Sequence, residues 1–312
     1  MKDFEYTAPE TLREAVKLLA EKSENARVLA GGTDLIVQMR GRRFQPDRVV
    51  DVKKIPEVNE LTFSPRKGLR IGAAVPCHII YRNADVIERF PAIVDSAMII
   101  GGIQIQGRAT LGGNLCNASP SADSIPTLIA YGAIAEIQGP EGKRKVPVEE
   151  FCIAPGRNAL KPGEILVCIQ IPQNRNNTGA HYLRFIPRNE MDIAVVGVGA
   201  CVELAGRGKA QTFKSVRIAL AAVGPTPIFA RDAGASLAGQ TVNDENILAA
   251  AEAAKSAATP ISDMRGPAEY RTHLVGVLTK RALIGAVKRA RGQNVPNAVQ
   301  ENDSGHPVYT LS

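Results

Sequence analysis

The sequence contains 312 residues, of which 45% are hydrophobic and 22% are charged, so it is long enough for about two domains of an ordinary globular protein. Its net charge of +7 comes from basic residues scattered along the chain, and it has no tryptophan, which together exclude nucleic-acid binding. No segment approaches the apolar length of a signal peptide or a membrane span, and the five cysteines occur singly; we therefore expect a cytoplasmic protein without a zinc or iron–sulfur site of its own.

The first 55 residues are predicted to form a small α/β unit. Residues 7–10, Thr-Ala-Pro-Glu, have the pattern of a helix capping box. Apolar residues at helical spacing follow as far as Leu19. Short apolar runs at 27–30 and 48–52 indicate two strands.

A pair of glycines lies between the first of these strands and the next predicted helix. A strand, a glycine turn and a helix start form the arrangement that points backbone N–H groups and the helix dipole at a phosphate. The alternative is that the glycines serve an ordinary turn and that Thr33 and Asp34 are a plain helix cap. We call this stretch the first glycine segment: Ala30, Gly31, Gly32, Thr33, Asp34 and Leu35.

Residues 56–173 are predicted to form a second, α+β lobe packed on the first. Apolar runs and their spacing distinguish its strands from its helices. The expected strands are 69–73, 133–137 and 165–171, and the expected helices are 76–90, 91–100 and one that begins near 125.

A second glycine pair lies inside this lobe. Adjacent glycines let the chain turn sharply and present bare N–H groups, which favour an anion such as phosphate. Asp123 follows, as an acceptor suited to sugar hydroxyls and not to phosphate, which it would repel. Two such segments suggest one diphosphate held between them. The second glycine segment comprises Thr110, Leu111, Gly112, Gly113 and Asn114.

The polar stretch at 173–179 is the best domain boundary in the chain. We expect a C-terminal α+β domain over 180–291 that serves packing and subunit contact, and a mobile tail over 292–312. Gly197 and Gly199 resemble a dinucleotide-binding glycine pattern, but residue 202 is valine, which excludes a Rossmann motif. The expected strands are 180–186, 193–204 and 213–223, and the expected helices are 243–258 and 270–291.

The sequence lacks the patterns of several kinds of catalytic site. It contains no nucleophile elbow and no P-loop. Its four histidines lack the spacing of metal ligands to one another or to cysteine. They are His78, His181, His273 and His306.

Five motifs in order give the sequence a family resemblance. It resembles the FAD-binding medium subunit of molybdenum hydroxylases over about residues 1–290. The resemblance implies an α+β fold, in which a two-lobed FAD-binding domain of the PCMH type (1–55 and 56–173) precedes a C-terminal α+β domain with a small antiparallel sheet and helices. The motifs are AGGTDL at 30–35, TLGGNLCNASPSAD at 110–123, RNEMDIAVVGVGA at 188–200, GPTP at 224–227 and RGPAEYRTHLVGVLTKRAL at 265–283.

The resemblance implies noncovalent FAD, with the two glycine segments around its diphosphate and Asp123 on a sugar-like part. Leu166, Tyr182 and Arg184 match positions near FAD in related enzymes, with Tyr182 against the isoalloxazine. The alternatives are that Leu166 is a core strand residue and Tyr182 a core aromatic. The sequence departs from the pattern at Gln106-Gly107, where relatives usually read Arg-Asn, and this puts a flavin or partner contact in doubt.

The implied function is electron transfer. A small subunit with [2Fe-2S] clusters passes electrons to the FAD, which delivers them to NAD, a quinone or oxygen. A large subunit oxidises the substrate at a molybdenum cofactor, and the heterotrimers usually pair into a heterohexamer. One alternative is a self-contained flavin oxidoreductase of the same fold, in which Glu190 and Asp192 flank a plausible loop. Another is a non-catalytic assembly protein. Neither substrate nor acceptor follows from the sequence.

Overall fold

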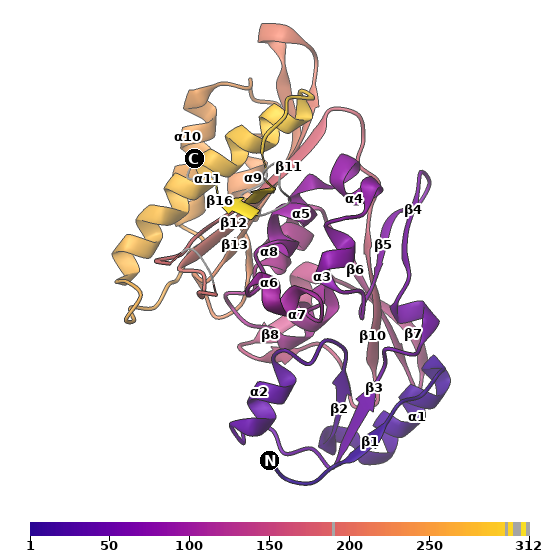
Figure 1. Ribbon diagram of the computed structural model, residues 1–312. Helices are drawn as coiled ribbons and strands as arrows, with labels where there is room; N and C mark the ends of the chain where they lie inside the picture. The colour runs from indigo at the N-terminus through magenta and orange to yellow at the C-terminus, as the bar shows by residue number, and fades with distance from the viewer. Residues whose placement is uncertain (189–190, 297–298, 302–306, 310–312) are drawn as a thin grey trace.

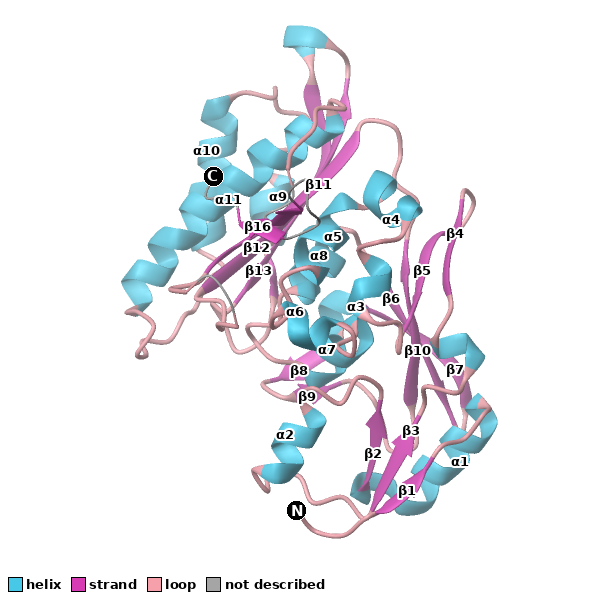
Figure 2. Cartoon of the chain, in the orientation of Figure 1, coloured by secondary structure: helices cyan, strands magenta, loops and turns pink. Residues whose placement is uncertain are grey.

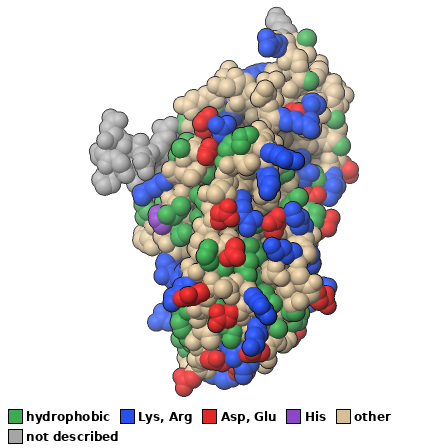
Figure 3. Space-filling view, turned by 90° about the vertical axis from the view of Figure 1, so that its right-hand side faces the viewer, with side chains coloured by type: hydrophobic (Ala, Val, Ile, Leu, Met, Phe, Trp, Pro, Cys, Tyr) green, Lys and Arg blue, Asp and Glu red, His purple; other side chains and the backbone are tan. Residues whose placement is uncertain are grey.

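The structure is a computed structural model that describes residues 1–188, 191–296, 299–301 and 307–309. Two lobes and a C-terminal domain follow one another along the molecule, from the lower end to the upper left of Figure 1. Helices and several separate small sheets make up the fold (Figure 2), which confirms the predicted α+β class. Among the helices of the described residues, none combines the length and apolar character needed to cross a bilayer. Basic and acidic side chains are interspersed over the face in Figure 3, which agrees with the scattered charge of the sequence.

The N-terminal lobe is a three-stranded parallel sheet in the order β1-β3-β2, with helix α1 packed on it. The predicted capping box is wrong. Thr7 ends β1 and pairs with Val50, so the helix begins later, where the Thr11 side chain accepts a hydrogen bond from the Glu14 N–H. The elements are β1 (Glu5–Thr7), α1 (Leu12–Lys22), β2 (Ala26–Leu29), α2 (Leu35–Arg40) and β3 (Arg48–Asp51).

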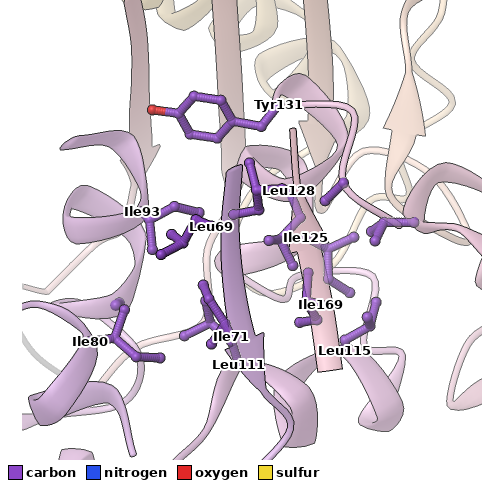
Figure 4. Close-up of a cluster of buried hydrophobic side chains, with 14 of the residues drawn as sticks. Leu69, Ile71, Ile80, Ile93, Leu111, Leu115, Ile125, Leu128, Tyr131 and Ile169 are labelled. Carbon is purple, nitrogen blue, oxygen red and sulfur yellow. The ribbon is translucent and has the colours of Figure 1, made fainter. Parts of the chain in front are cut away.

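The second lobe has a five-stranded antiparallel sheet in the order β4-β5-β10-β6-β7. Short helices cover it, and Figure 4 shows the core between them, where Ile71 and Ile169 of the strands lie among Ile93, Leu111 and Ile125 of the helices. The strands are β4 (Leu61–Ser64), β5 (Gly68–Gly72), β6 (Ile134–Gly139), β7 (Gly142–Pro147) and β10 (Ile165–Ile171), beside a small pair formed by β8 (Cys152–Ala154) and β9 (Arg157–Asn158).

The helices of this lobe are shorter than the sequence predicts. The helix expected over 76–90 is two helices, because the Asn83 side chain accepts a hydrogen bond from the Val86 N–H and starts a new one. The helices are α3 (Cys77–Ile80), α4 (Ala84–Arg89), α5 (Pro91–Ala97), α6 (Ile103–Gln106), α7 (Leu111–Asn117) and α8 (Ser124–Ala130).

The C-terminal domain is a four-stranded antiparallel sheet between two layers of helices. Helices α10 and α11 cover one face, and α5 and α8 of the second lobe cover the other. A Cβ on Gly199 of β12 would lie 2.7 Å from the Pro126 carbonyl oxygen of α8, so glycine is needed for this close approach. The elements are β11 (Thr178–Phe185), β12 (Val196–Ala205), β13 (Thr212–Ala221), β14 (Ile228–Phe229), α9 (Arg231–Ala235), α10 (Asp244–Lys255) and α11 (Ala268–Ala290).

Beyond α11, the strands β15 (Val299–Glu301) and β16 (Pro307–Tyr309) pair antiparallel. The other residues from 297 to 312 lie outside the described part. The mobility of the tail stays a prediction, as do the domain boundaries given above.

Candidate functional site

The first glycine segment packs against Arg108 and Ala109, the two residues that precede the second segment. A Cβ on Gly31 would lie 2.1 Å from the Arg108 carbonyl oxygen, and the Arg108 Nε donates to the Gly31 carbonyl at 3.4 Å. Nearby, Gln38 Nε2 of α2 donates to Asn117 Oδ1 of α7 at 3.0 Å, and α2 lies below α7 in Figure 2. Segments that are far apart in sequence therefore form one surface.

The first glycine segment connects β2 to α2, as predicted. Gly32 has a φ of +78°, a conformation that strongly favours glycine. Asp34 precedes the helix without a side-chain capping hydrogen bond, so the plain-cap alternative is not supported for this residue. Partial desolvation raises the pKa of Asp34 although its side chain remains exposed.

The second glycine segment is a helix start and not a sharp turn, which corrects the sequence prediction. Gly112 and Gly113 lie in the first turn of α7. A Cβ on Gly112 would lie 2.4 Å from the Ala73 carbonyl oxygen, so close packing against the end of β5 explains this glycine. Thr110 caps the helix, since its Oγ1 accepts from the Gly113 N–H at 2.8 Å. The N–H groups of Leu111 and Gly112, at the first two helical positions, have no acceptor within the helix.

Asn114 and Asp123 are tied to neighbouring residues. Asn114 Oδ1 accepts from Ser124 Oγ at 2.6 Å. Asp123 is 8% exposed, and its two oxygens accept from the Tyr182 hydroxyl at 2.9 Å and the Arg184 guanidinium at 2.7 Å. Burial raises the pKa of Asp123, while Arg184 opposes that shift. Each oxygen of Asp123 already accepts one hydrogen bond, so its contact with a cofactor hydroxyl stays a prediction.

The remaining predicted site residues are largely buried. Tyr182 is 1% exposed and packs against Ile99 and Met98, which favours the core-aromatic alternative. Leu166 is 3% exposed in the core of the second lobe, which favours the core-strand alternative. The Arg184 side chain is 7% exposed. The flavin contacts of these three residues stay predictions.

The departure at Gln106-Gly107 has a structural explanation for Gln106 and none for Gly107. Gln106 is buried, and its Nε2 donates to the Met98 carbonyl at 2.6 Å and to the Ile100 carbonyl at 3.5 Å. The side chain thus satisfies two carbonyls that follow α5. A Cβ on Gly107 would meet no atom within 4 Å, so packing does not require glycine there.

The described residues contain no group of three or more His, Cys, Asp or Glu side chains that could hold a metal ion. Two cavities of about 930 and 740 Å³ lie along the C-terminal end of α11 and not at the glycine segments. A glycine turn packed on Arg108, helix-start N–H groups that lack an acceptor within their own helix and an exposed acid at residue 34 fit the diphosphate and sugar parts of a dinucleotide.

Comparison with known proteins identifies the family. Residues 2–174 match the family described as "FAD binding domain in molybdopterin dehydrogenase", and residues 181–286 match "CO dehydrogenase flavoprotein C-terminal domain". The chain therefore belongs to the family of FAD-binding subunits of molybdopterin dehydrogenases. It is an FAD-dependent oxidoreductase subunit with an electron-transfer role, as the sequence predicts.

Individual relatives agree over nearly their whole length. The xanthine dehydrogenase FAD-binding subunit of Escherichia coli O157:H7 is 32% identical over 295 residues, which cover 94% of this chain and 99% of the relative. The carbon monoxide dehydrogenase medium chain of Afipia carboxidovorans is 33% identical over 290 residues, with coverages of 92% and 98%. A chain of the reconstituted CO dehydrogenase from Oligotropha carboxidovorans superposes with a TM-score of 0.87 at 32% identity, covering 92% of this chain and 98% of that one.

Proposed function

We propose that the two glycine segments hold FAD, with the backbone of Gly31, Gly32, Leu111 and Gly112 around its diphosphate. The observation that carries this proposal is the close approach of Gly31 to the Arg108 backbone, because Arg108 lies two residues before Thr110 and the approach brings two anion-favouring segments near each other. The cofactor then lies between the two lobes. Bound FAD supplies the redox chemistry, and the protein binds and orients it.

The same proposal extends to the assembly. The chain acts beside a large molybdenum-cofactor subunit and a small iron–sulfur subunit, in a dimer of heterotrimers that passes electrons to NAD, a quinone or oxygen. Relatives named as medium chains of carbon monoxide dehydrogenase support this arrangement. We place the protein in the cytoplasm, since its five cysteines are free thiols and free thiols suit a reducing compartment.

Two variants, each at a single glycine, test the cofactor site. In Gly31→Ala the added Cβ collides with the Arg108 carbonyl oxygen, so we expect the FAD dissociation constant to rise at least about tenfold, or about 1.4 kcal/mol. The control is Gly107→Ala, whose Cβ meets open space and leaves the constant unchanged. Flavin fluorescence titration of the apoprotein measures both. Equal FAD affinities for Gly31→Ala and the wild type would show that FAD binds elsewhere.

The self-contained flavin oxidoreductase is the remaining enzymatic alternative. Of its candidate acids, Glu190 lies outside the described residues, and Asp192 is engaged by Arg188 and by the Ile193 N–H. We expect the purified chain to bind FAD without oxidising substrate, and the co-purified complex to contain molybdenum and iron. Substrate turnover by the isolated chain would favour the alternative.

A further inference from the structure

One short stretch connects the C-terminal sheet to the second glycine segment. This connecting segment (residues 118–123) runs from the end of α7 to the start of α8. The C-terminal domain holds it at two points. Tyr182 and Arg184 of β11 both donate to Asp123, and the Ala222 N–H donates to the Pro120 carbonyl at 2.7 Å.

On its other side the connecting segment leads directly to the glycine segment. Ser124 follows Asp123 in the chain, and its Oγ and N–H both donate to Asn114 Oδ1, at 2.6 and 3.4 Å. Asn114 is one residue beyond the glycine pair in α7. A continuous path of hydrogen bonds and covalent bonds therefore runs from β11 to the glycine segment.

The strand that starts this path is itself fixed. Tyr182 and Arg184 are two residues apart, so they lie on one face of β11. The Tyr182 N–H donates to Asp95 Oδ2 of α5 at 3.2 Å, and Arg289 of α11 donates to the Ala180 carbonyl at 2.8 Å. The β11 side chains thus meet Asp123 from a rigid support.

We propose that Tyr182 and Arg184 are positioning residues that, through Asp123 and Ser124, fix Asn114 in the cofactor site, so that the C-terminal domain sets the FAD affinity. This inference rests on the proposed function, because it assumes that the second glycine segment holds FAD. The physical reason is the burial of Asp123. A buried carboxylate that loses its donors must find others, and the connecting segment moves with it.

A double-variant cycle tests the path. Tyr182→Phe removes one donor to Asp123 and keeps the ring, and Ser124→Ala removes the shortest bond to Asn114. We expect each single variant to raise the FAD dissociation constant about fivefold. The double variant should have a dissociation constant no higher than that of the more affected single variant, since both substitutions interrupt one path. Unchanged affinities, or effects that multiply in the double variant, would overturn the proposal. The second result would indicate direct, independent contacts with FAD.

Arginine variants distinguish a positioning role in FAD binding from a general loss of protein stability. Arg184→Lys keeps the charge beside Asp123, so it should retain more FAD affinity than Arg184→Met. The control is Arg217→Met, which breaks the Arg217 ion pair with Glu149 and its bond to the Ile129 carbonyl across the same domain interface. It should lower the melting temperature but leave FAD affinity within twofold. An equal loss of affinity in Arg217→Met would overturn the proposal.

The outcome for Gly31→Ala distinguishes the two levels of inference. If that variant keeps wild-type FAD affinity, the proposed cofactor site fails. If it loses affinity while Tyr182→Phe and Ser124→Ala do not, only the positioning role fails. Circular dichroism of each variant establishes that it is folded before its affinity is compared.

Discussion

His181 illustrates how a single buried residue affects this protein. Its imidazole lies beside Asp95, with 4.0 Å between Nε2 and Oδ2, and beside Gly285, where a Cβ would lie 2.0 Å from Nδ1. Nδ1 is buried and has no hydrogen-bond partner among the residues that the structure describes. Burial lowers the pKa of His181 to about 4, with Asp95 opposing and Arg289 reinforcing the shift. The folded protein therefore holds this side chain neutral.

Acid should destabilise the protein through this residue. The pKa falls from 6.5 in the unfolded chain to about 4 on folding, so the unfolded state binds more protons between these values. Stability is present above pH 6.5 and is lost as the pH falls towards 4. In His181→Gln, which cannot titrate, we expect the loss of unfolding free energy from pH 7 to pH 5 to shrink by about 2 kcal/mol. Urea unfolding at both pH values measures it, and equal losses in both proteins would contradict the expectation.

Some residues of the candidate site were predictable from local sequence patterns, and others were not. Gly31 and Gly32 were recognisable because a strand and a helix flank them, and both patterns are local. The partners of Asp123 were not recognisable, because Tyr182 lies 59 residues away and no local pattern encodes such a pair. Gly112 is recognisable in the sequence as part of a glycine pair. The reason for glycine at this position is its close contact with Ala73, which forms only after folding and which no local pattern encodes.

At the scale of elements, the start of α1 shows how tertiary pairing selects between two caps. Residues 7–10 and residues 11–14, Thr-Leu-Arg-Glu, both fit the capping pattern. Thr7 is taken by the parallel pairing of β1 with β3, and its neighbours extend along the sheet. The helix therefore uses Thr11, and the sequence alone could not rank the two.

The two caps predict different costs on mutation. Thr11→Ala removes the acceptor for the Glu14 N–H and should lower the free energy of unfolding by about 1 kcal/mol. Thr7→Ala serves as the matched variant and should cost less than half of that, since its hydroxyl bond to the Val49 carbonyl is 3.5 Å long and therefore weak. Urea unfolding followed by circular dichroism compares them. A larger loss of unfolding free energy in Thr7→Ala than in Thr11→Ala would instead support Thr7 as the helix cap.

At the scale of the whole molecule, a buried ion pair joins residues 194 positions apart. The Asp95 side chain in α5 is fully buried. It receives Arg289 of α11 at 2.5 Å and 2.9 Å, through the two nitrogens of the guanidinium. The pair links the second lobe to the last helix of the C-terminal domain across β11.

Removing one partner of the Asp95–Arg289 ion pair should lower the free energy of unfolding. Arg289→Met leaves the Asp95 carboxylate buried without its guanidinium, so we expect the free energy of unfolding to fall by about 3 kcal/mol or more. The double variant Asp95→Asn/Arg289→Met should recover part of the loss, because no charge remains buried. The exposed Arg207 provides the control, and Arg207→Met should change stability by less than about 0.5 kcal/mol. Urea titration measures all three, and an equal loss in the single and double variants would contradict the charge-burial explanation.

The order of the parts was predictable at this scale, but their arrangement was not. Apolar runs predicted β5, β6 and β10, because each strand carries its own local signal. The placement of β10 between β5 and β6, and of the C-terminal sheet on α5 and α8, depends on contacts between distant residues. The family resemblance supplied the fold and the cofactor, which composition and spacing alone did not.

The Asp95–Arg289 pair also bears on how the chain matures during synthesis. Helix α5 leaves the ribosome long before α11 does, so Asp95 is made 194 residues before its partner Arg289. Because contacts between distant positions form slowly, β11 gains its final support only when the last helix docks. A nascent chain that ends before α11 would therefore carry both glycine segments, yet lack the support that settles Tyr182 against Asp123.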